Sequence, residues 1–303
     1  MPELLHSTRI RIAAETSLGS GVADGAGWHE IPTTGAAVER ELVSTAQRTS
    51  LHGQITAREV ISDAWSFRTA HEANLALVIW LITPHMTAAG EGVWQLDPEA
   101  DGPSYVVETT SEGGDIAIYR GTRMTELQIS WEERRILQLE AQWSALRRQD
   151  LEEPLAGIDG PSLAGPMLPN SAAAMAIATG TWGDNPKTDN AVITHGGQIV
   201  MTREIQARNF GPDGYPETFN NAPWTVLSEI YLPQTAGITD QAFSDAWTGR
   251  LALWLGTGGE HFRINRAHGV VVEEDLKAYD WRVRRLTTEA LADDFRTTLE
   301  FRA

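Results

Sequence analysis

The chain has 303 residues, a formal net charge of −17 and no cysteine, and 42% of its residues are hydrophobic. The composition is typical of a folded protein, and the length suits one large domain or two domains of about 150 residues. The negative charge disfavours a nucleic-acid-binding protein, because such proteins need clustered Lys and Arg against phosphate. The lack of cysteine excludes disulfides, thiolate zinc sites and thiol nucleophiles.

No targeting or membrane segment is expected. The first residues lack a basic region followed by an apolar run, so no secretory signal is predicted. The longest apolar stretch, Ala73–Ile82, is about half of the ~20 residues that span a bilayer. We therefore expect a protein made in a cytoplasm that does not use a membrane.

The first half opens with two long strands and a helix. Val38–Thr45 and Ala57–Phe67 are predicted to be paired strands. A helix is expected over Ala70–Ile82, with Thr69 and Glu72 as its capping box. This helix is apolar almost all round, which predicts burial on every side.

The stretch "TELQISWEERRILQLEAQWSALRR", Thr125–Arg148, alternates strictly between apolar and polar residues. The apolar set is Leu127, Ile129 and Trp131, followed by Leu137, Leu139, Ala141, Trp143 and Ala145. Such alternation predicts two half-buried β-strands and not a helix. Charged and amide side chains occupy the opposite face.

Residues 151–169 are rich in Pro and Gly and are predicted to link two halves. The expected organisation is a β module over 1–150, a linker over 151–169 and a second β module over 170–303. "GGQIVMTREIQARN" from Gly196 resembles "GAAVERELVSTAQ" from Gly35, and a loop over Phe210–Pro223 and a helix from Thr239 follow. We interpret this as a tandem duplication, with chance similarity of two β-rich halves as the alternative.

No motif for catalysis or for a cofactor is found. The glycine cluster Gly19–Gly27 lacks the spacing and the βαβ context of a dinucleotide site, and the histidines lack metal spacing. Asp97–Glu108 matches the spacing of a calcium loop, but its flanks read as strands, so an acidic turn is favoured over a cation site. We expect no enzyme, no cofactor and no metal; a hydrolase using two distant carboxylates is the alternative.

The element order, the stretch "YRGTRMTELQISWEERRILQLEAQWSAL" and the Gly-initiated "GGQIVMTREIQARN" resemble the tail tube proteins of long-tailed bacteriophages. The resemblance implies two tandem β-sandwich or barrel modules, each with one short helix and long hairpins that join an inner barrel. It implies a structural virion protein that assembles in the host cytoplasm into stacked rings, which form a hollow conduit for genome delivery. A β-sandwich binding or adhesion module of a virion is the alternative.

The resemblance also implies partners and a lining for the bore. The subunit would bind itself, with a trimeric pseudo-hexamer favoured over a hexamer, and would contact tape measure, tail terminator and distal or baseplate proteins. DNA would pass through transiently and without sequence preference. Acidic residues would line the lumen and repel phosphate; the candidates are Glu39, Glu41, Glu59, Asp63, Glu204 and Glu229.

Overall fold

The computed structural model is mainly β, as the alternation predicts. It describes residues 7–22, 27–31, 35–51, 54–72, 75–90, 93–97, 99–111, 113–132, 138–160, 163, 173–177, 191–192, 196–210, 216–233, 251–257, 260–278, 281–289 and 299–302. Strands β3, β4, β12, β13 and β18 to β21 are described by their backbone path and register.

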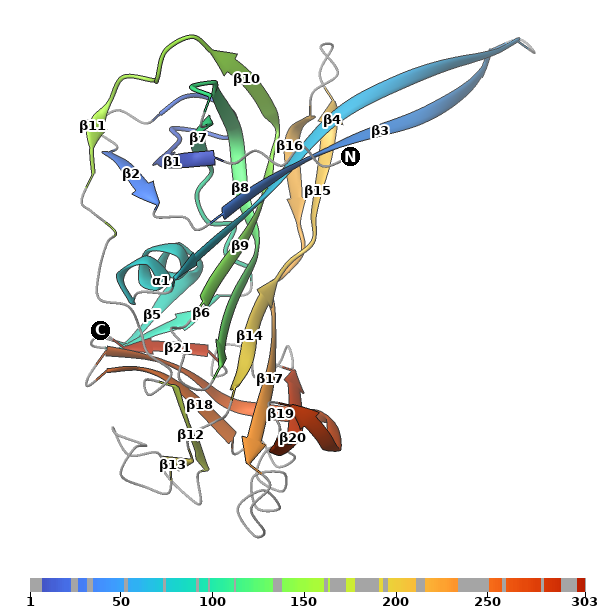
Figure 1. The fold of residues 1–303 in the computed structure, drawn as a ribbon. Helices are drawn as coiled ribbons and strands as arrows, with labels where there is room; N and C mark the ends of the chain where they lie inside the picture. Colours follow the sequence, from blue (N-terminus) through green and yellow to red (C-terminus); the bar gives the residue numbers. More distant parts are fainter. Residues whose placement is uncertain are drawn as a thin grey trace.

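A sheet of antiparallel strands, which we call the main sheet, runs through the molecule (Figure 1). Its order is β3–β4–β9–β8–β14–β17–β20–β19, so four strands from the first half are followed by four from the second. The strands are β3 (Gly35–Leu51), β4 (Gln54–Glu72), β9 (Gln138–Ala145), β8 (Ile116–Glu132), β14 (Gly196–Thr202), β17 (Thr225–Pro233), β20 (Trp281–Glu289) and β19 (Glu260–Ala278). The halves meet where β14 pairs with β8.

Each half also builds a side sheet on one strand that it shares with the main sheet. The orders are β2–β1–β7–β8–β10 in the first half and β13–β12–β18–β19–β21 in the second. The strands are β1 (Ser7–Ala14), β2 (Gly27–Ile31), β7 (Tyr105–Ser111), β10 (Arg147–Leu151), β12 (Ala173–Ile177), β13 (Ala191–Val192), β18 (Leu251–Thr257) and β21 (Leu299–Arg302). The second side sheet continues from β21 into β6 (Val93–Leu96) and β5 (Met86–Gly90) of the first half. The two halves therefore repeat one order of pairing in both sheets.

Strand β8 passes from the side sheet into the main sheet at Gly121. Residues before it pair with β7 and β10, and Thr122 directly after it still pairs with β7. From Arg123 onwards the strand pairs with β9 and then also with β14. Gly121 has a φ of 63°, and a Cβ there would lie 2.6 Å from Leu146 Cδ1. Glycine is required at this crossing because the left-handed backbone disfavours any side chain and the space is filled.

The buried face of the main sheet is the apolar face that the alternation predicts. Its described members on β8 and β9 are each at most 5% exposed: Leu127, Ile129, Trp131, Leu139, Ala141, Trp143 and Ala145. The buried row continues on β14 through Ile199 and Met201 and on β17 through Val226. Leu137 lies outside the described residues.

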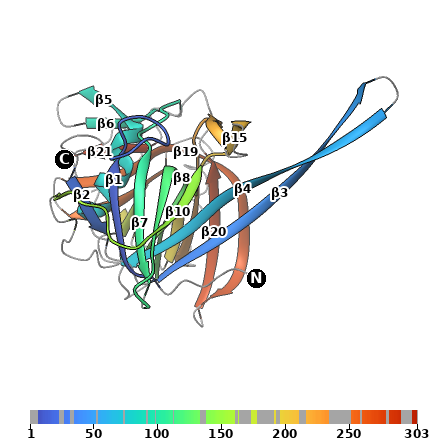
Figure 2. The ribbon, with the colours of Figure 1, turned by 90° about the horizontal axis from the view of Figure 1, so that it is seen from above.

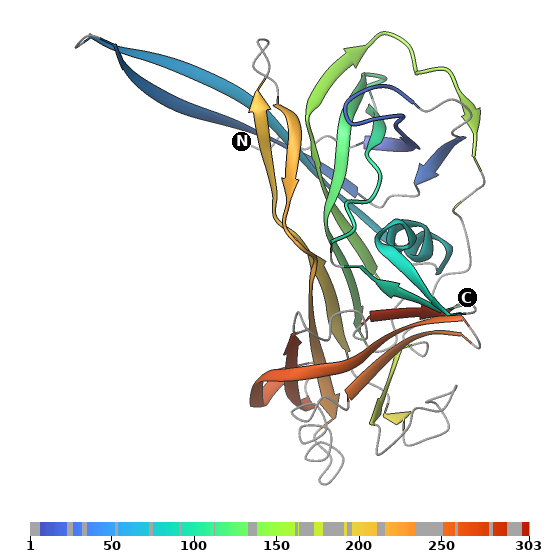
Figure 3. The ribbon, with the colours of Figure 1, turned by 180° about the vertical axis from the view of Figure 1, so that it is seen from behind.

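Helix α1 (Leu75–Ile82) packs on the buried face (Figures 1 and 3). Trp80 connects the helix to both sheets. The centre of its ring lies 5.7 Å from the ring of Tyr105 on β7, and the ring of Tyr105 lies 6.0 Å from the ring of Trp143 on β9. The expected helix start at Ala70 and capping box of Thr69 and Glu72 are wrong, since β4 continues to Glu72. The physical reason is the pairing of β4 with β9 up to Gln138, which outweighs the local capping signal. The second expected helix, from Thr239, lies outside the described residues.

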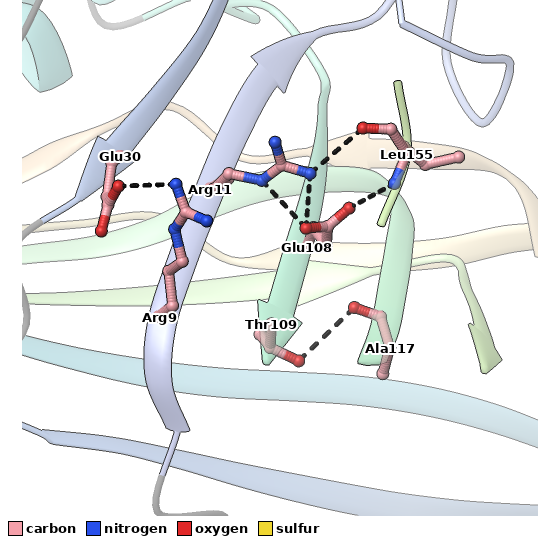
Figure 4. A network of polar contacts seen from close by, with 7 residues as sticks. All are labelled: Arg9, Arg11, Glu30, Glu108, Thr109, Ala117 and Leu155. Carbon is pink, nitrogen blue, oxygen red and sulfur yellow. Dashed lines mark hydrogen bonds and ion pairs between the residues drawn. The ribbon is translucent and has the colours of Figure 1, made fainter. Parts of the chain in front are cut away.

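A buried ion pair holds part of the Pro-rich and Gly-rich segment 151–169 to the first side sheet (Figure 4). Oε1 of Glu108 accepts hydrogen bonds from Nε and Nη2 of Arg11 at 2.9 and 2.6 Å. The N–H of Leu155 donates to the other oxygen of Glu108 at 2.8 Å, and its carbonyl accepts from Arg11 at 3.1 Å. Three residues further on, β11 (Ile158–Asp159) pairs in parallel with β2, so the start of this segment packs on the first half.

Each half carries a two-stranded ribbon, and the two ribbons take different paths. β3 and β4 pair without a register shift from Gly35 to Leu51, and their outer part projects away from the body (Figure 2). In the second half, β15 (Ile205–Phe210) and β16 (Pro216–Asn221) form a hairpin beyond β14 and β17 that lies alongside the first half (Figures 1 and 3). The loop expected over Phe210–Pro223 is therefore partly wrong, because β16 pairs with β15.

Candidate assembly surfaces

The second face of the main sheet, which we call the polar face, is the first candidate surface. Its polar side chains on the four central strands are Glu126, Gln128, Ser130 and Glu132 on β8, Gln138, Glu140, Gln142 and Ser144 on β9, Gln198 and Thr202 on β14, and Thr225 and Glu229 on β17. All of them are half-buried or exposed. They include four carboxylates. By register Arg123 of β8, opposite Ser144, lies at the end of this face, where it pairs with Asp101 at 3.7 Å. The described side chains on this part of the polar face therefore keep a net negative charge.

Side-chain amides connect the strands of the polar face. Nε2 of Gln128 donates to Oε1 of Gln198 at 2.7 Å, and Nε2 of Gln198 donates to Oε2 of Glu229 at 2.9 Å. This row crosses the junction between the two halves. Nε2 of Gln142 donates to Oε1 of Glu126 at 3.0 Å in the same manner. These amide donors orient carboxylates without neutralising them, because a neutral amide carries no charge.

The predicted lumen residues fall on different surfaces. Glu229 lies on the polar face. Glu39 and Glu41 share that face by register. Glu39 is opposite Ser66 of β4, and Ser66 is opposite the half-buried Ser144 of β9.

Glu59 and Asp63 stand opposite Ala46 and Leu42, at the alternate positions, and so belong to the other face of the β3–β4 ribbon. Glu204 is exposed and lies between β14 and β15, where its Oε1 accepts a hydrogen bond from Gln206 at 2.6 Å. The register thus brings Glu39, Glu41 and Glu229 to one face and puts Glu59 and Asp63 on the other, whereas Glu204 lies between two strands and outside the paired register.

Three carboxylates of the polar face were missed in the sequence: Glu126, Glu132 and Glu140. The signal that could have found them is the alternation of Thr125–Arg148, since every residue between the buried ones must face the other way. No local pattern in the sequence predicts the pairing of β8 with β14, which places Gln198 between Gln128 and Glu229.

The two edges of the main sheet are the second candidate surface. Within the described part of the chain, β3 pairs only with β4, and residues 268–278 of β19 pair only with β20. Both edges present backbone N–H and C=O groups along one side. An edge strand of this kind is a template for pairing with another strand.

A cluster that we call the clasp (Arg203, Trp224, His85, Asn221 and Asp101) joins the two halves beside the sheet junction. Arg203 is buried, and its Nε donates to the carbonyl of Met124 at 3.1 Å. Its Nη1 donates to the carbonyls of Ala100 and Asp101 at 3.3 and 3.1 Å. These contacts are strong because a guanidinium donates several charge-assisted hydrogen bonds at once.

Trp224 fills the centre of the clasp. Its ring lies 4.4 Å below the guanidinium carbon of Arg203 and 5.0 Å from the ring of His85. Burial, together with the nearby charge of Arg203, lowers the pKa of His85 to about 3, so this ring is neutral at neutral pH. At the rim, Nδ2 of Asn221 donates to Oδ1 of Asp101 at 2.6 Å.

The stretch Asp97–Glu108 does not gather its carboxylates around one point. Asp97 caps the N–H of Glu99 at 3.1 Å, whereas Glu108 is buried against Arg11. Within the residues that the structure describes, no group of three His, Asp or Glu side chains could hold a metal ion. None of the helices described is long and apolar enough to cross a bilayer.

The sequence matches no protein-family model, and no curated protein is similar to it. The repeated strand order, the polar face, the edges and the clasp are therefore the features from which a function can be inferred.

Proposed function

We propose that the protein is a structural subunit of a phage tail tube, which assembles side by side into rings and stacks into a hollow conduit. The observation that carries the proposal is the repeated order of pairing in the two halves, joined edge to edge in one sheet. A repeat that already joins its neighbour within the chain has the geometry to join the next chain in the same way. This repetition supports two tandem modules, as the resemblance to tail tube proteins implies.

A ring would remove both open edges of the main sheet. The contact joins two different surfaces, the β3 edge of one copy and the β19 edge of the next, and such a head-to-tail contact produces a closed ring or an open helix. Closing a sheet into a barrel is the arrangement that leaves no edge. With eight strands from each chain, three copies would supply 3 × 8 strands to one wall.

The width of such a barrel is consistent with a conduit. Strands that lie about 4.8 Å apart and tilt by about 40° give a backbone diameter of about 48 Å for three copies. Side chains of the polar face would occupy the periphery of this space. The rival arrangement, a ring of six full chains, would double the number of strands unless part of the second half lay outside the wall.

The charge of the polar face suits a bore through which DNA moves. Carboxylates on the wall repel phosphate over roughly the Debye length, ~8 Å at physiological salt. The amide rows hold Glu126 and Glu229 in place, so that the wall has fixed negative charge and few groups that bind phosphate. Tape measure, terminator and distal tail proteins are the partners that this function implies.

Negative-stain electron microscopy of the purified protein at rising concentration tests the proposal. We expect rings, or tubes built of rings, with three copies in each ring. Rings of six copies would support the rival arrangement. Compact monomers at every concentration, with no ring or tube, would contradict the function.

The charge of the bore is tested separately with lysine variants of particles that carry this protein. Glu126→Lys, Glu140→Lys and Glu229→Lys together reverse charge on the polar face, and we expect intact tubes that release DNA more slowly. Glu152→Lys, Glu153→Lys and Asp115→Lys, at exposed sites outside the main sheet, make the matched control. Equal release from both variants would remove the assignment of the polar face to the bore.

A further inference from the structure

The segments where the two ribbons leave the main sheet correspond residue by residue. Val38–Leu42 reads "VEREL", and Met201–Ile205 reads "MTREI". In β3 and β4, Arg40 is directly opposite Trp65. In the second half, Thr202 is opposite Thr225, so the next position outward places Arg203 at Trp224, where the cation lies on the ring. Arg40 with Trp65 is therefore the first-half counterpart of Arg203 with Trp224.

In the second half this Arg and Trp pair is seated on a bulge of the neighbouring strand. The β8–β9 register shifts between Met124 and Glu126, which leaves Thr125 as the extra residue. The backbone N–H of Arg203 donates to the carbonyl of Thr125 at 2.9 Å, and its Nε donates to the carbonyl of Met124. The bulge thus presents two carbonyls to one arginine.

Strand β19, the counterpart of β8, has a bulge at the same place. Its register with β20 shifts between Gly269 and Val271, which leaves Val270 as the extra residue. Thr125 and Val270 both lie where the shared strand enters the main sheet from its side sheet. Among the strands that the structure describes, no partner pairs with β19 at Val270 on the side away from β20. The bulge at Val270 in the second half thus corresponds to the bulge at Thr125 in the first half. Arg40 and Trp65 in the first half correspond to Arg203 and Trp224 in the second.

We infer that a second copy of this chain joins the two: Arg40 and Trp65 of one copy dock at the Val270 bulge of the next, as Arg203 and Trp224 dock at Thr125. The backbone N–H of Arg40 donates to the carbonyl of Val270 in the second copy, and β3 runs antiparallel to β19. This inference rests on the proposed side-by-side assembly and names its contact and register.

The register that follows is compatible with the charges and with the alternation. Glu39 is opposite Val271 of the second copy, and Ala37 is opposite Glu273, so no two carboxylates face each other directly. Glu39 lies on the polar face, and Val271 does as well, because its partner Thr287 pairs with Glu229. Each face of the sheet is therefore continuous across the contact.

Cross-linking tests the register, since the natural chain has no cysteine. Residues directly opposite in an antiparallel pair have Cα atoms about 4.5–5.5 Å apart, within the range of a disulfide. A chain with Glu39→Cys and Val271→Cys is expected to form ladders of linked chains on a non-reducing gel. The matched control, Glu126→Cys with Thr202→Cys, is opposite within one chain and should form a disulfide without increasing the mass.

A displaced pair, Glu39→Cys with Glu273→Cys, separates the outcomes. Ladders from this pair alone would overturn the register, and rings that form without ladders from either pair would overturn the contact while the tube proposal stands. Absence of rings from the unmodified protein would remove the tube proposal itself.

A second experiment tests the arginine. Arg40→Ala is expected to raise the concentration at which half of the chains are in rings by at least tenfold and to leave the Tm of the monomer unchanged. Arg203→Ala should instead lower the monomer Tm, because its contact lies within the chain. Arg48→Ala, further out on the same face of β3, is the control and should change neither quantity. Unchanged assembly for Arg40→Ala, or a loss of Tm equal to that of Arg203→Ala, would overturn the inference.

Discussion

The two ribbons of this protein leave the main sheet at equivalent positions and take different paths. In the second half the ribbon turns at Arg203 and lies against the first half, where the clasp holds it. In the first half β3 and β4 stay paired without a register shift beyond Trp65, the outermost residue of β4 that pairs with β9. The outer part of this ribbon leaves the body (Figure 2). The difference teaches that the path of each ribbon depends on its neighbour, because a two-stranded ribbon alone is only marginally stable in water.

The largest expected effect comes from breaking the clasp at its centre. Trp224→Ala should lower the free energy of unfolding by about 3–5 kcal/mol, since a large buried ring is lost and its space cannot be refilled. Urea denaturation measures this change, and limited proteolysis should then cut within residues 205–221. Phe219→Ala, on the same ribbon but partly exposed, is the matched control and should cost about 1 kcal/mol or less. Equal losses for the two variants would mean that the clasp does not hold the ribbon.

Acid should weaken the same contact. His85 has a folded pKa of about 3 against an ordinary value of 6.5, because burial and the facing charges of Arg203 and Arg123 disfavour the imidazolium. Its contribution to stability is complete above pH 6.5 and is lost as the pH falls towards 3. Between pH 7.5 and 4.5 the loss is about 3 kcal/mol.

The measurement is urea denaturation of the wild type and His85→Gln at both pH values. Other carboxyl groups titrate in both proteins, so the difference between the two pH-dependent losses isolates His85. An identical pH dependence in the two proteins would contradict the assignment.

The smallest effect is expected at the rim of the clasp. Asn221→Ala removes the hydrogen bond to Asp101 and should cost about 1 kcal/mol, because the bond is exposed although its acceptor is charged. Asn220→Ala, at the neighbouring exposed position of β16, should change stability by less than about 0.5 kcal/mol. If thermal denaturation finds the two variants equally stable, Asn221 does not contribute to holding the ribbon.

The strands of the first half could be predicted because their pattern is local. The alternation at Leu127, Ile129 and Trp131 needs only a two-residue period, and the structure buries these residues. The paired strands Val38–Thr45 and Ala57–Phe67 are confirmed for the same reason, within the longer β3 and β4.

The errors arise where a distant partner decides the local structure. Thr69 and Glu72 match the spacing of a capping box, yet β9 pairs with this segment and extends the strand. The loop expected over Phe210–Pro223 contains turn residues, yet β15 supplies a partner for Pro216–Asn221. Tertiary pairing overrides local propensity in both places.

The candidate surfaces could be predicted only in part. Carboxylates can be counted in the sequence, but the face that each one occupies depends on the register, which separates Glu59 and Asp63 from Glu39 and Glu41. The clasp could not be found, because Arg203 meets Trp224 only through the pairing of β14 with β17.

The crossing of β8 at Gly121 gives the fold a mechanical property. One continuous strand belongs to both sheets of the first half, and β19 does the same in the second half. A change in strand tilt within the main sheet therefore cannot occur without rotating the side sheet attached to it. We therefore expect each half to act as a lever with its pivot at the crossing. In the ring that we propose, a change of inner diameter would then be transmitted to the outer surface.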